Sequence, residues 1–188
     1  LYCTDEIKNR ILKYNSEDQK VFEWGVEGSA EGQFSKPAGI ASDLAGHLYV
    51  VDAGNHRIQK FTDDGEFIHS WGEFGSEQGQ LSDPWGIAVD SQGFVYVADW
   101  GNNRVQKFTG DGEWLQNFGA PLPEELRLDH PSDVAVDSEG DVYVADWGNK
   151  KVQIFDSDGE ILTSLYGDAG ELSRSALNFM EVNQDYHK

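Results

Sequence analysis

The sequence places carboxylates that could bind a metal ion at regular intervals. Asp43, Asp90 and Asp137 each follow a short apolar run, and 47 residues separate each from the next. If the three side chains point toward a common centre, their oxygen atoms suit calcium, which prefers oxygen ligands. We favour a turn-initiating role, because each aspartate stands three residues before a glycine. Apart from this calcium hypothesis, the sequence indicates no cofactor.

A second set of charged residues recurs with the same spacing, in segments of the form Asp-x-Gly-Asn-x-Arg or, in the first copy, Asp-x-x-x-Asn-Arg. Its members are Asp5, Arg10, Asp52, Arg57, Asp99, Arg104 and Asp146. An aspartate in such a turn accepts backbone N–H bonds, and a nearby arginine donates charge-assisted hydrogen bonds to a carboxylate. Because a catalytic site is rarely built four times in one chain, we predict a structural role. Lys151 replaces the arginine in the last copy, where we expect weaker geometry.

Tryptophans occupy positions where another copy of the same segment carries a small residue. Trp85 corresponds to Ala38, and Trp100 corresponds to Ala53, so the backbone requires an indole at neither place. Tryptophan is favoured at the centres of binding interfaces. Recognition therefore competes with packing between repeats as an explanation. The candidate binding residues are Trp85, Trp100, Trp147, His56 and Asn103. His56 and Asn103 share one repeat position, close in sequence to that of Trp100.

The sequence lacks the common catalytic motifs. It contains no Gly-x-Ser-x-Gly elbow, phosphate-binding loop or dinucleotide fingerprint. Its five histidines do not recur every 47 residues, and none pairs with another at a metal-ligand spacing. We therefore predict no catalytic residue and favour a binding role over an enzymatic one.

Composition limits the partners of this chain. Its 188 residues include 14 Lys and Arg against 34 Asp and Glu, which gives a formal net charge of −20. Nucleic acids and anionic membrane surfaces would be repelled, whereas cations and basic protein patches would be attracted. No apolar run reaches the roughly 18 residues of a membrane-spanning helix. The sequence thus predicts a soluble domain and leaves both a bacterial cytoplasmic and an exported location open.

The elements that must position these residues are short strands separated by turns. Within one period the expected strands are Ile87–Asp90, Phe94–Ala98, Arg104–Phe108 and Glu113–Phe118. The connections leave no room for a crossover helix, so the four strands form an antiparallel meander. The second strand is apolar on both faces and must be covered on both sides. Sheets stacked face to face around an axis, as in a β-propeller, meet this requirement.

One segment resembles a known repeat family. Pro84–Phe108 begins Pro-Trp-Gly-Ile-Ala-Val-Asp and ends Val-Tyr-Val-Ala-Asp-Trp-Gly-Asn-Asn-Arg-Val-Gln-Lys-Phe, and it is similar to the NHL repeat almost throughout. Pro37–Phe61 and Pro131–Phe155 resemble the repeat with small departures, and Leu1–Tyr14 resembles its second half. The resemblance implies an all-β fold, a β-propeller of four-stranded antiparallel blades, usually six. It also implies a binding platform, although a minority of the family are enzymes.

Three functional hypotheses follow from the residues and the resemblance. The favoured one is a non-catalytic binding or scaffold module that presents its tryptophan-bearing face to a protein or a small ligand. The second is a metal-dependent lyase or lactonase with its site in the central channel. The third is an assembly component that pairs with other chains through open blade edges.

The repeat pattern predicts two regions in the chain. Residues 1–167 are expected to form about four blades, namely three complete ones and three strands of another. The remaining blades of a six-bladed propeller would lie in missing sequence or in a partner chain. Residues 168–188 leave the pattern, and the near-helical spacing of Leu172, Ala176, Phe179 and Met180 predicts a short amphipathic helix.

Overall fold

Four antiparallel sheets make up the part of the chain that the computed structural model describes, which is residues 1–119 and 122–167. Each sheet is one blade. Blade 1 comprises β1 (Tyr2–Asp5), β2 (Arg10–Tyr14) and β3 (Lys20–Trp24). Blade 2 comprises β4 (Pro37–Ser42), β5 (Leu48–Asp52), β6 (Arg57–Phe61) and β7 (Phe67–Trp71). Blade 3 comprises β8 (Pro84–Val89), β9 (Val95–Asp99), β10 (Arg104–Phe108) and β11 (Trp114–Phe118). Blade 4 comprises β12 (Pro131–Val136), β13 (Val142–Asp146), β14 (Lys151–Phe155) and β15 (Ile161–Tyr166).

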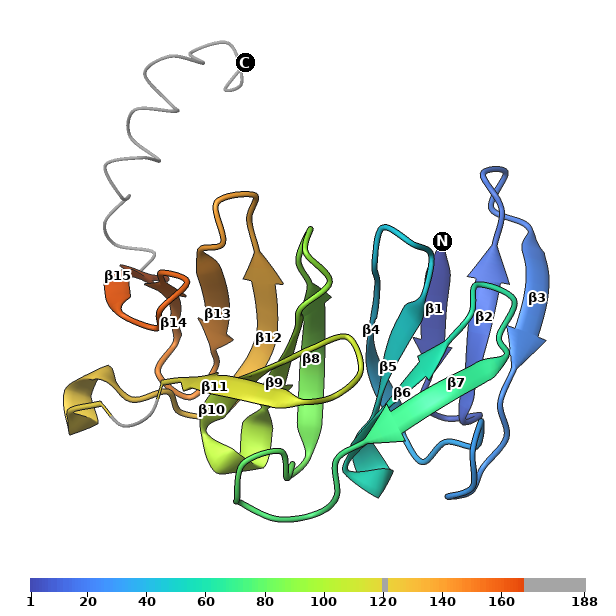
Figure 1. Cartoon of the computed structure of the whole chain (residues 1–188), viewed down its shortest axis with the longest axis horizontal. Helices are drawn as coiled ribbons and strands as arrows, with labels where there is room; N and C mark the ends of the chain where they lie inside the picture. The colour runs from blue at the N-terminus through green and yellow to red at the C-terminus, as the bar shows by residue number, and fades with distance from the viewer. Residues whose placement is uncertain (120–121, 168–188) are drawn as a thin grey trace, which may run out of the picture.

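Each blade is a meander in which every strand pairs with the next one along the chain. Figure 1 shows the four sheets side by side, from blade 1 in blue to blade 4 in orange. Short 3-10 turns, η1 (Ala53–Asn55) and η2 (Trp100–Asn102), join the second and third strands of blades 2 and 3, and η3 (Glu124–Leu126) lies between blades 3 and 4. The predicted all-β propeller architecture, with three complete blades and three strands of another, is confirmed.

The second strands are buried because neighbouring blades cover both of their faces. Every residue of β5 and of β9 is buried. Tyr49 and Val51 of blade 2 pack with Val95, Val97 and other residues of blade 3 in one apolar cluster. Equivalent clusters lie between blades 1 and 2 and between blades 3 and 4. The core is therefore a series of layers between sheets, as the doubly apolar strand predicts.

Glycines in the third-to-fourth-strand turns allow the blades to approach closely. Gly65 and Gly112 have φ values of +81° and +87°. A Cβ atom on Gly65 would lie 2.9 Å from the Trp24 ring, and one on Gly112 would lie 2.6 Å from the Trp71 ring. Glycine is needed at both places because the backbone is left-handed and an indole of the preceding blade fills the space. These contacts fix the spacing between successive sheets.

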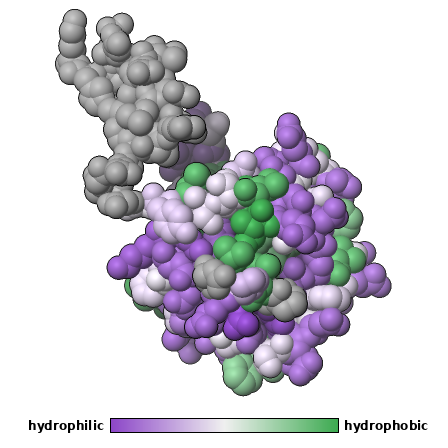
Figure 2. All heavy atoms as spheres, turned by 90° about the vertical axis from the view of Figure 1, so that its left-hand side faces the viewer, coloured by the Kyte–Doolittle hydropathy of each residue, from purple (hydrophilic) through white to green (hydrophobic). Residues whose placement is uncertain are grey.

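The outward face of blade 4 is an apolar surface with no described blade beside it. Leu165 is 48% exposed, whereas Phe118, at the same repeat position in blade 3, is fully buried. Val152 is partly exposed, whereas its counterpart Val105 is buried. Figure 2 views the molecule from this side and shows an apolar band running across it. We call this surface the blade 4 face.

Two expectations concern parts of the chain beyond this description. The predicted C-terminal helix lies in residues 168–188, outside the described residues. The boundary at residue 167 and the total of six blades remain predictions. In the described part of the chain, no helix is long and apolar enough to cross a membrane.

Candidate functional site

The Trp face is the end of the blades formed by the turns into each first strand and the turns after each second strand. In blade 3 the start of β8 pairs with the end of β9, so that Pro84 lies opposite Asp99. Trp85 follows the first of these residues and Trp100 follows the second. Antiparallel pairing therefore brings together two indoles that are 15 residues apart in the sequence.

The repeated aspartates hold this face rigid. Asp99 is fully buried. Its carboxylate accepts hydrogen bonds from the Ser82 backbone N–H, the Asn102 side chain, Arg104 Nε and Gln106 Nε2. Asp52 has the same set of partners in blade 2. In this geometry the carboxylates of Asp52 and Asp99 bond to the surrounding turns and have no open position for a ligand.

The arginines connect this network to the loop between blades. Arg104 donates through Nε to Asp99 and through Nη2 to the backbone carbonyls of Glu77 and Gln80. In blade 4, Lys151 lies 3.8 Å from Asp146 as an ion pair only. The Oε1 atom of Gln153 beside it is buried and has no partner within the described residues. The weaker geometry expected at Lys151 agrees with this arrangement.

His56 and Asn103 lie at a repeat position that joins successive blades. Both adopt left-handed backbone conformations. His56 Nδ1 accepts a hydrogen bond from the Asp83 backbone N–H, and Asn103 Oδ1 accepts one from the His130 backbone N–H. In the same way, Asn9 of blade 1 accepts a hydrogen bond from the backbone N–H of Lys36, which directly precedes blade 2. The structure thus places Asn103 in an inter-blade hydrogen bond, while His56 both makes that bond and lines a cleft.

Three aromatic rings contact one another in succession on the Trp face. The Trp85 and Trp100 rings are nearly parallel, with an interplanar angle of 19° and centroids 5.8 Å apart. The His130 ring lies 4.2 Å from Trp100 on the next blade, and its Nδ1 contacts Asp129. Trp100 is partly buried between its neighbours, whereas Trp85 is 48% exposed. The row therefore ends in a half-exposed indole.

A cleft of about 680 Å³ lies beside this half-exposed indole. We call it the Trp cleft, and its lining residues include Ala38, Ala53, Gly54, Trp85 and Trp100. The cleft exists because blade 2 carries alanine at the two positions where blade 3 carries tryptophan. A volume of this size is typical of small-molecule sites.

Charged groups of both signs stand at the rim of the Trp cleft. Glu6, Lys36 and Asp83 line it, and all three are exposed. Their side chains make no hydrogen bond or ion pair with residues 1–119 and 122–167, since the bonds of Lys36 and Asp83 come from their backbone N–H groups. Two carboxylates against one ammonium give the rim a net negative charge.

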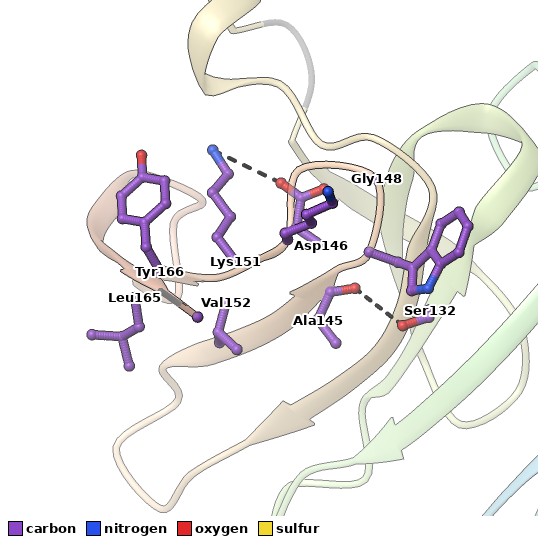
Figure 3. A pocket seen from close by; sticks show the side chains of 11 residues that line it. Ser132, Ala145, Asp146, Gly148, Lys151, Val152, Leu165 and Tyr166 are labelled. Carbon is purple, nitrogen blue, oxygen red and sulfur yellow. Dashed lines mark hydrogen bonds and ion pairs between the residues drawn. The ribbon is translucent and has the colours of Figure 1, made fainter. Parts of the chain in front are cut away.

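Trp147 lies apart from the other two predicted tryptophans. It is 66% exposed and lines a second cleft, of about 730 Å³, on the blade 4 face. Figure 3 shows this cleft, with Leu165, Tyr166 and Val152 beside the Lys151–Asp146 ion pair. Leu165 and Val152 correspond to Phe118 and Val105 of blade 3, which are fully buried. The cleft is thus an uncovered blade surface rather than a site built by convergent polar groups.

The aspartates considered for calcium lie in the turns at the opposite end of the blades. Asp43 accepts bonds from the backbone N–H groups of Ala45 and His47 and from the Tyr49 hydroxyl. Burial raises the pKa of Asp43, but hydrogen bonds from His47 and Tyr49 outweigh this effect and hold it below 3.8. Burial, followed by the negative charge of Asp43, raises the pKa of Tyr49.

The same turn geometry recurs in the other two blades. Asp90 and Asp137 also accept a bond from a tyrosine hydroxyl and from backbone N–H groups of their own turns. Among the described residues, no group of three or more His, Cys, Asp or Glu is placed to hold a metal ion. The three aspartates are therefore not brought together, and calcium binding remains a prediction.

Sequence reasoning missed two parts of the site. It did not include His130, the third of the contacting rings. No sequence pattern links His130 to Trp100, and their connection is the hydrogen bond from the His130 backbone N–H to Asn103, in the turn that contains Trp100. Sequence reasoning also treated Ala38 and Ala53 as a comparison for the tryptophans, whereas they form the wall of the cleft. The repeat alignment contained that signal, since a small residue beside a large one leaves a space.

Comparisons with known proteins agree with this architecture. The NHL repeat family matches residues 34–61, 81–108 and 128–155, which cover the first three strands of blades 2, 3 and 4. No curated protein sequence matches the chain.

Several solved structures share the fold. A streptogramin B lyase aligns with a TM-score of 0.69 and 16% identity over 90% of this chain and 51% of its own. Virginiamycin B lyase from Staphylococcus aureus aligns with a TM-score of 0.62 and 21% identity over 84% of this chain and 48% of its own. A protein of unknown function from Bacteroides caccae aligns with a TM-score of 0.60 and 14% identity over 89% of this chain and 59% of its own.

The chain spans about half the length of the two lyases, and identities this low establish the fold alone. The family matches and the sheet topology lead to the same result. The chain carries three NHL repeats, at residues 34–61, 81–108 and 128–155, and its described residues form blades of a β-propeller.

Proposed function

We propose that this chain is a binding module and that its ligand occupies the Trp cleft. The observation that carries the proposal is the half-exposed Trp85, stacked on Trp100 at the side of a cleft that Ala38 and Ala53 leave open. A large indole held by a neighbour loses little conformational entropy when it binds a ligand. The Trp85 indole can stack on a flat ring of a ligand or bury an apolar group of it.

The rest of the Trp face supports this role by being rigid. The aspartate networks of blades 2 and 3 fix the turns that carry the alanines and the tryptophans. The inter-blade bond from Asp83 to His56 fixes one blade against the next. A preformed site requires less ordering on binding, which favours affinity.

A lyase or lactonase remains the alternative function. Two of the similar solved structures are lyases, and they share the propeller fold with this chain. The described residues gather contacting aromatic rings beside the cleft and no group of three or more His, Cys, Asp or Glu placed to hold a metal ion. We therefore propose binding, with Trp85 and Trp100 as the contact residues.

The proposal can be tested by observing the six tryptophan indole N–H signals in a nuclear magnetic resonance spectrum. The protein would be screened against a set of small ring compounds that are cationic, neutral or anionic. We expect at least one compound to shift the signals of Trp85 and Trp100. Trp147→Ala should retain that binding, whereas Trp85→Ala should lose it. If every binding compound shifts only the signals of Trp147 or of the core tryptophans, the proposed site is wrong.

A further inference from the structure

The open face of Trp85 is the starting point for assigning a ligand class to the Trp cleft. Trp85 stacks on Trp100 through one face of its indole. Within the described residues, Trp85 makes no second aromatic pair and no cation–π contact, and it remains 48% exposed. An indole face carries negative electrostatic potential and attracts a cation more strongly than any other side-chain ring.

The charge at the rim favours the same sign of ligand. Glu6 and Asp83 present two carboxylates without a partner in the described part of the chain, against the single ammonium of Lys36. The whole chain has a formal net charge of −20, so its long-range field also attracts cations and repels anions. Aromatic wall, rim and overall field therefore all favour a positive charge.

The shape of the cleft sets the kind of cation. A bare metal ion needs several converging oxygen or nitrogen ligands, and the described residues form no such group here. Ala38 and Ala53 instead place methyl groups in the lining of the cleft, together with the indole of Trp85. Such a lining suits a cation that carries its charge on an alkyl or planar group, which is weakly hydrated and makes dispersion contacts.

We propose that the Trp cleft selects an organic cation, an ammonium or guanidinium group placed against the open face of Trp85 with Glu6 and Asp83 at the rim. This inference rests on the proposed function, because it assigns a ligand class to the same site. The group can belong to a free small molecule or to a basic side chain of a peptide. The chemistry is shared, and separate experiments distinguish the two sources.

The test uses three compounds of nearly the same shape and different charge. They are choline, neutral 3,3-dimethylbutan-1-ol and the 3,3-dimethylbutanoate anion, each titrated while the indole signal of Trp85 is observed. We expect choline to bind about tenfold more tightly than the neutral compound, which corresponds to about 1.4 kcal/mol. The anion should bind most weakly. Trp147→Leu is the matched control and should leave this order unchanged.

Variants at the rim give effects of opposite sign. Glu6→Gln and Asp83→Asn should each weaken choline binding severalfold and leave the neutral compound unaffected. Lys36→Ala should strengthen choline binding, because it removes the only opposing charge. All three positions are exposed, so these substitutions should not affect folding. For the peptide source, a short arginine peptide should bind more tightly than its citrulline counterpart.

The outcomes separate this inference from the proposed function. If all three compounds shift Trp85 and Trp100 with equal affinity, the cleft is a binding site but cation selectivity is wrong. The same holds if the anion binds most tightly. If none of the three shifts these signals while other ring compounds do, the assignment of the ligand class is also wrong. If no compound of any charge shifts them, both proposals are wrong.

Discussion

Asp99 shows how one residue supports the whole Trp face. Its buried carboxylate is the shared acceptor for a backbone N–H, an asparagine, an arginine and a glutamine. Removing the carboxylate would leave a nearly buried guanidinium without its counter-charge. The first copy of the motif is different, because among the described residues the Asp5 side chain bonds only to the Lys8 N–H and to Arg10, and it is 21% exposed.

We expect Asp99→Ala to lower the free energy of unfolding by about 3 to 5 kcal/mol, the cost of leaving a buried charge unpaired. Asp5→Ala is the matched control at the same repeat position. It should cost much less, because water can replace the lost partner. Urea unfolding of both variants measures the difference. Equal losses would contradict the structural role of the buried network.

The pKa of Asp43 predicts a pH dependence of stability. Hydrogen bonds in the folded state hold this pKa below 3.8, so the carboxylate stabilises the fold fully above that pH. The contribution is lost as the pH falls through the lower folded-state value. We expect Asp43→Asn to destabilise by roughly 1 kcal/mol at neutral pH. The difference from wild type should shrink in acid.

Urea unfolding at a series of pH values checks this prediction. Glu113→Gln is the control, because Glu113 is exposed and its side chain has no partner in the described residues. That variant should show no comparable pH-dependent difference. An Asp43→Asn effect that stays constant or grows below pH 3.8 would overturn the assignment.

At the scale of the element, each blade stabilises the next through the same repeat positions. Phe118 at the end of β11 is fully buried against blade 4. Leu165 occupies the same position in β15 and is 48% exposed on the blade 4 face. The two side chains should contribute differently to the free energy of unfolding, because Phe118 has a neighbouring blade and Leu165 has none in the described structure.

We expect Phe118→Ala to cost about 3 to 5 kcal/mol of unfolding free energy, since it removes a buried ring and leaves a cavity. Leu165→Ala should cost less than about 1 kcal/mol, because most of the lost contact is with solvent. Thermal or chemical unfolding compares the pair. A cost at Leu165 as large as that at Phe118 would mean that this face is covered.

The strands of blades 2, 3 and 4 were predictable because three signals agree in these copies: a 47-residue period, the turn glycines and apolar runs on both faces of the second strand. The grouping of the tryptophans was less predictable. Trp100 and Trp147 share a repeat position, yet one blade step separates them, and only Trp100 has Trp85 beside it. A repeat alignment gives equivalence of position and does not show which copies meet across blades. Asn103 was misleading for the same reason, because its partner lies in the following blade.

At the scale of the whole molecule, the blade 4 face is an apolar surface without an assigned partner in the described residues. An apolar surface of this kind usually marks an interaction site. Pairing between chains through open blade edges is the third of the three functional hypotheses, and the net charge of −20 on each chain opposes such pairing.

We expect concentration-dependent association of two copies that strengthens with added salt, because salt screens the repulsion between them. Leu165→Lys should abolish the association, whereas Leu115→Lys, an exposed leucine on blade 3, should leave it unchanged. Sedimentation velocity at several protein and salt concentrations measures this. A monomer under all these conditions would rule out self-assembly through this face.

The Trp cleft can be tested most directly by filling it. Ala38→Trp places an indole in the cleft at a position where blade 3 already carries Trp85, so the backbone should accept it. Ser132→Trp adds the same side chain at the same repeat position of blade 4, away from the cleft. We predict that Ala38→Trp folds normally and loses binding of choline or of any compound found in the screen, while Ser132→Trp binds like wild type. Unchanged affinity in a folded Ala38→Trp protein would contradict a ligand site between these blades.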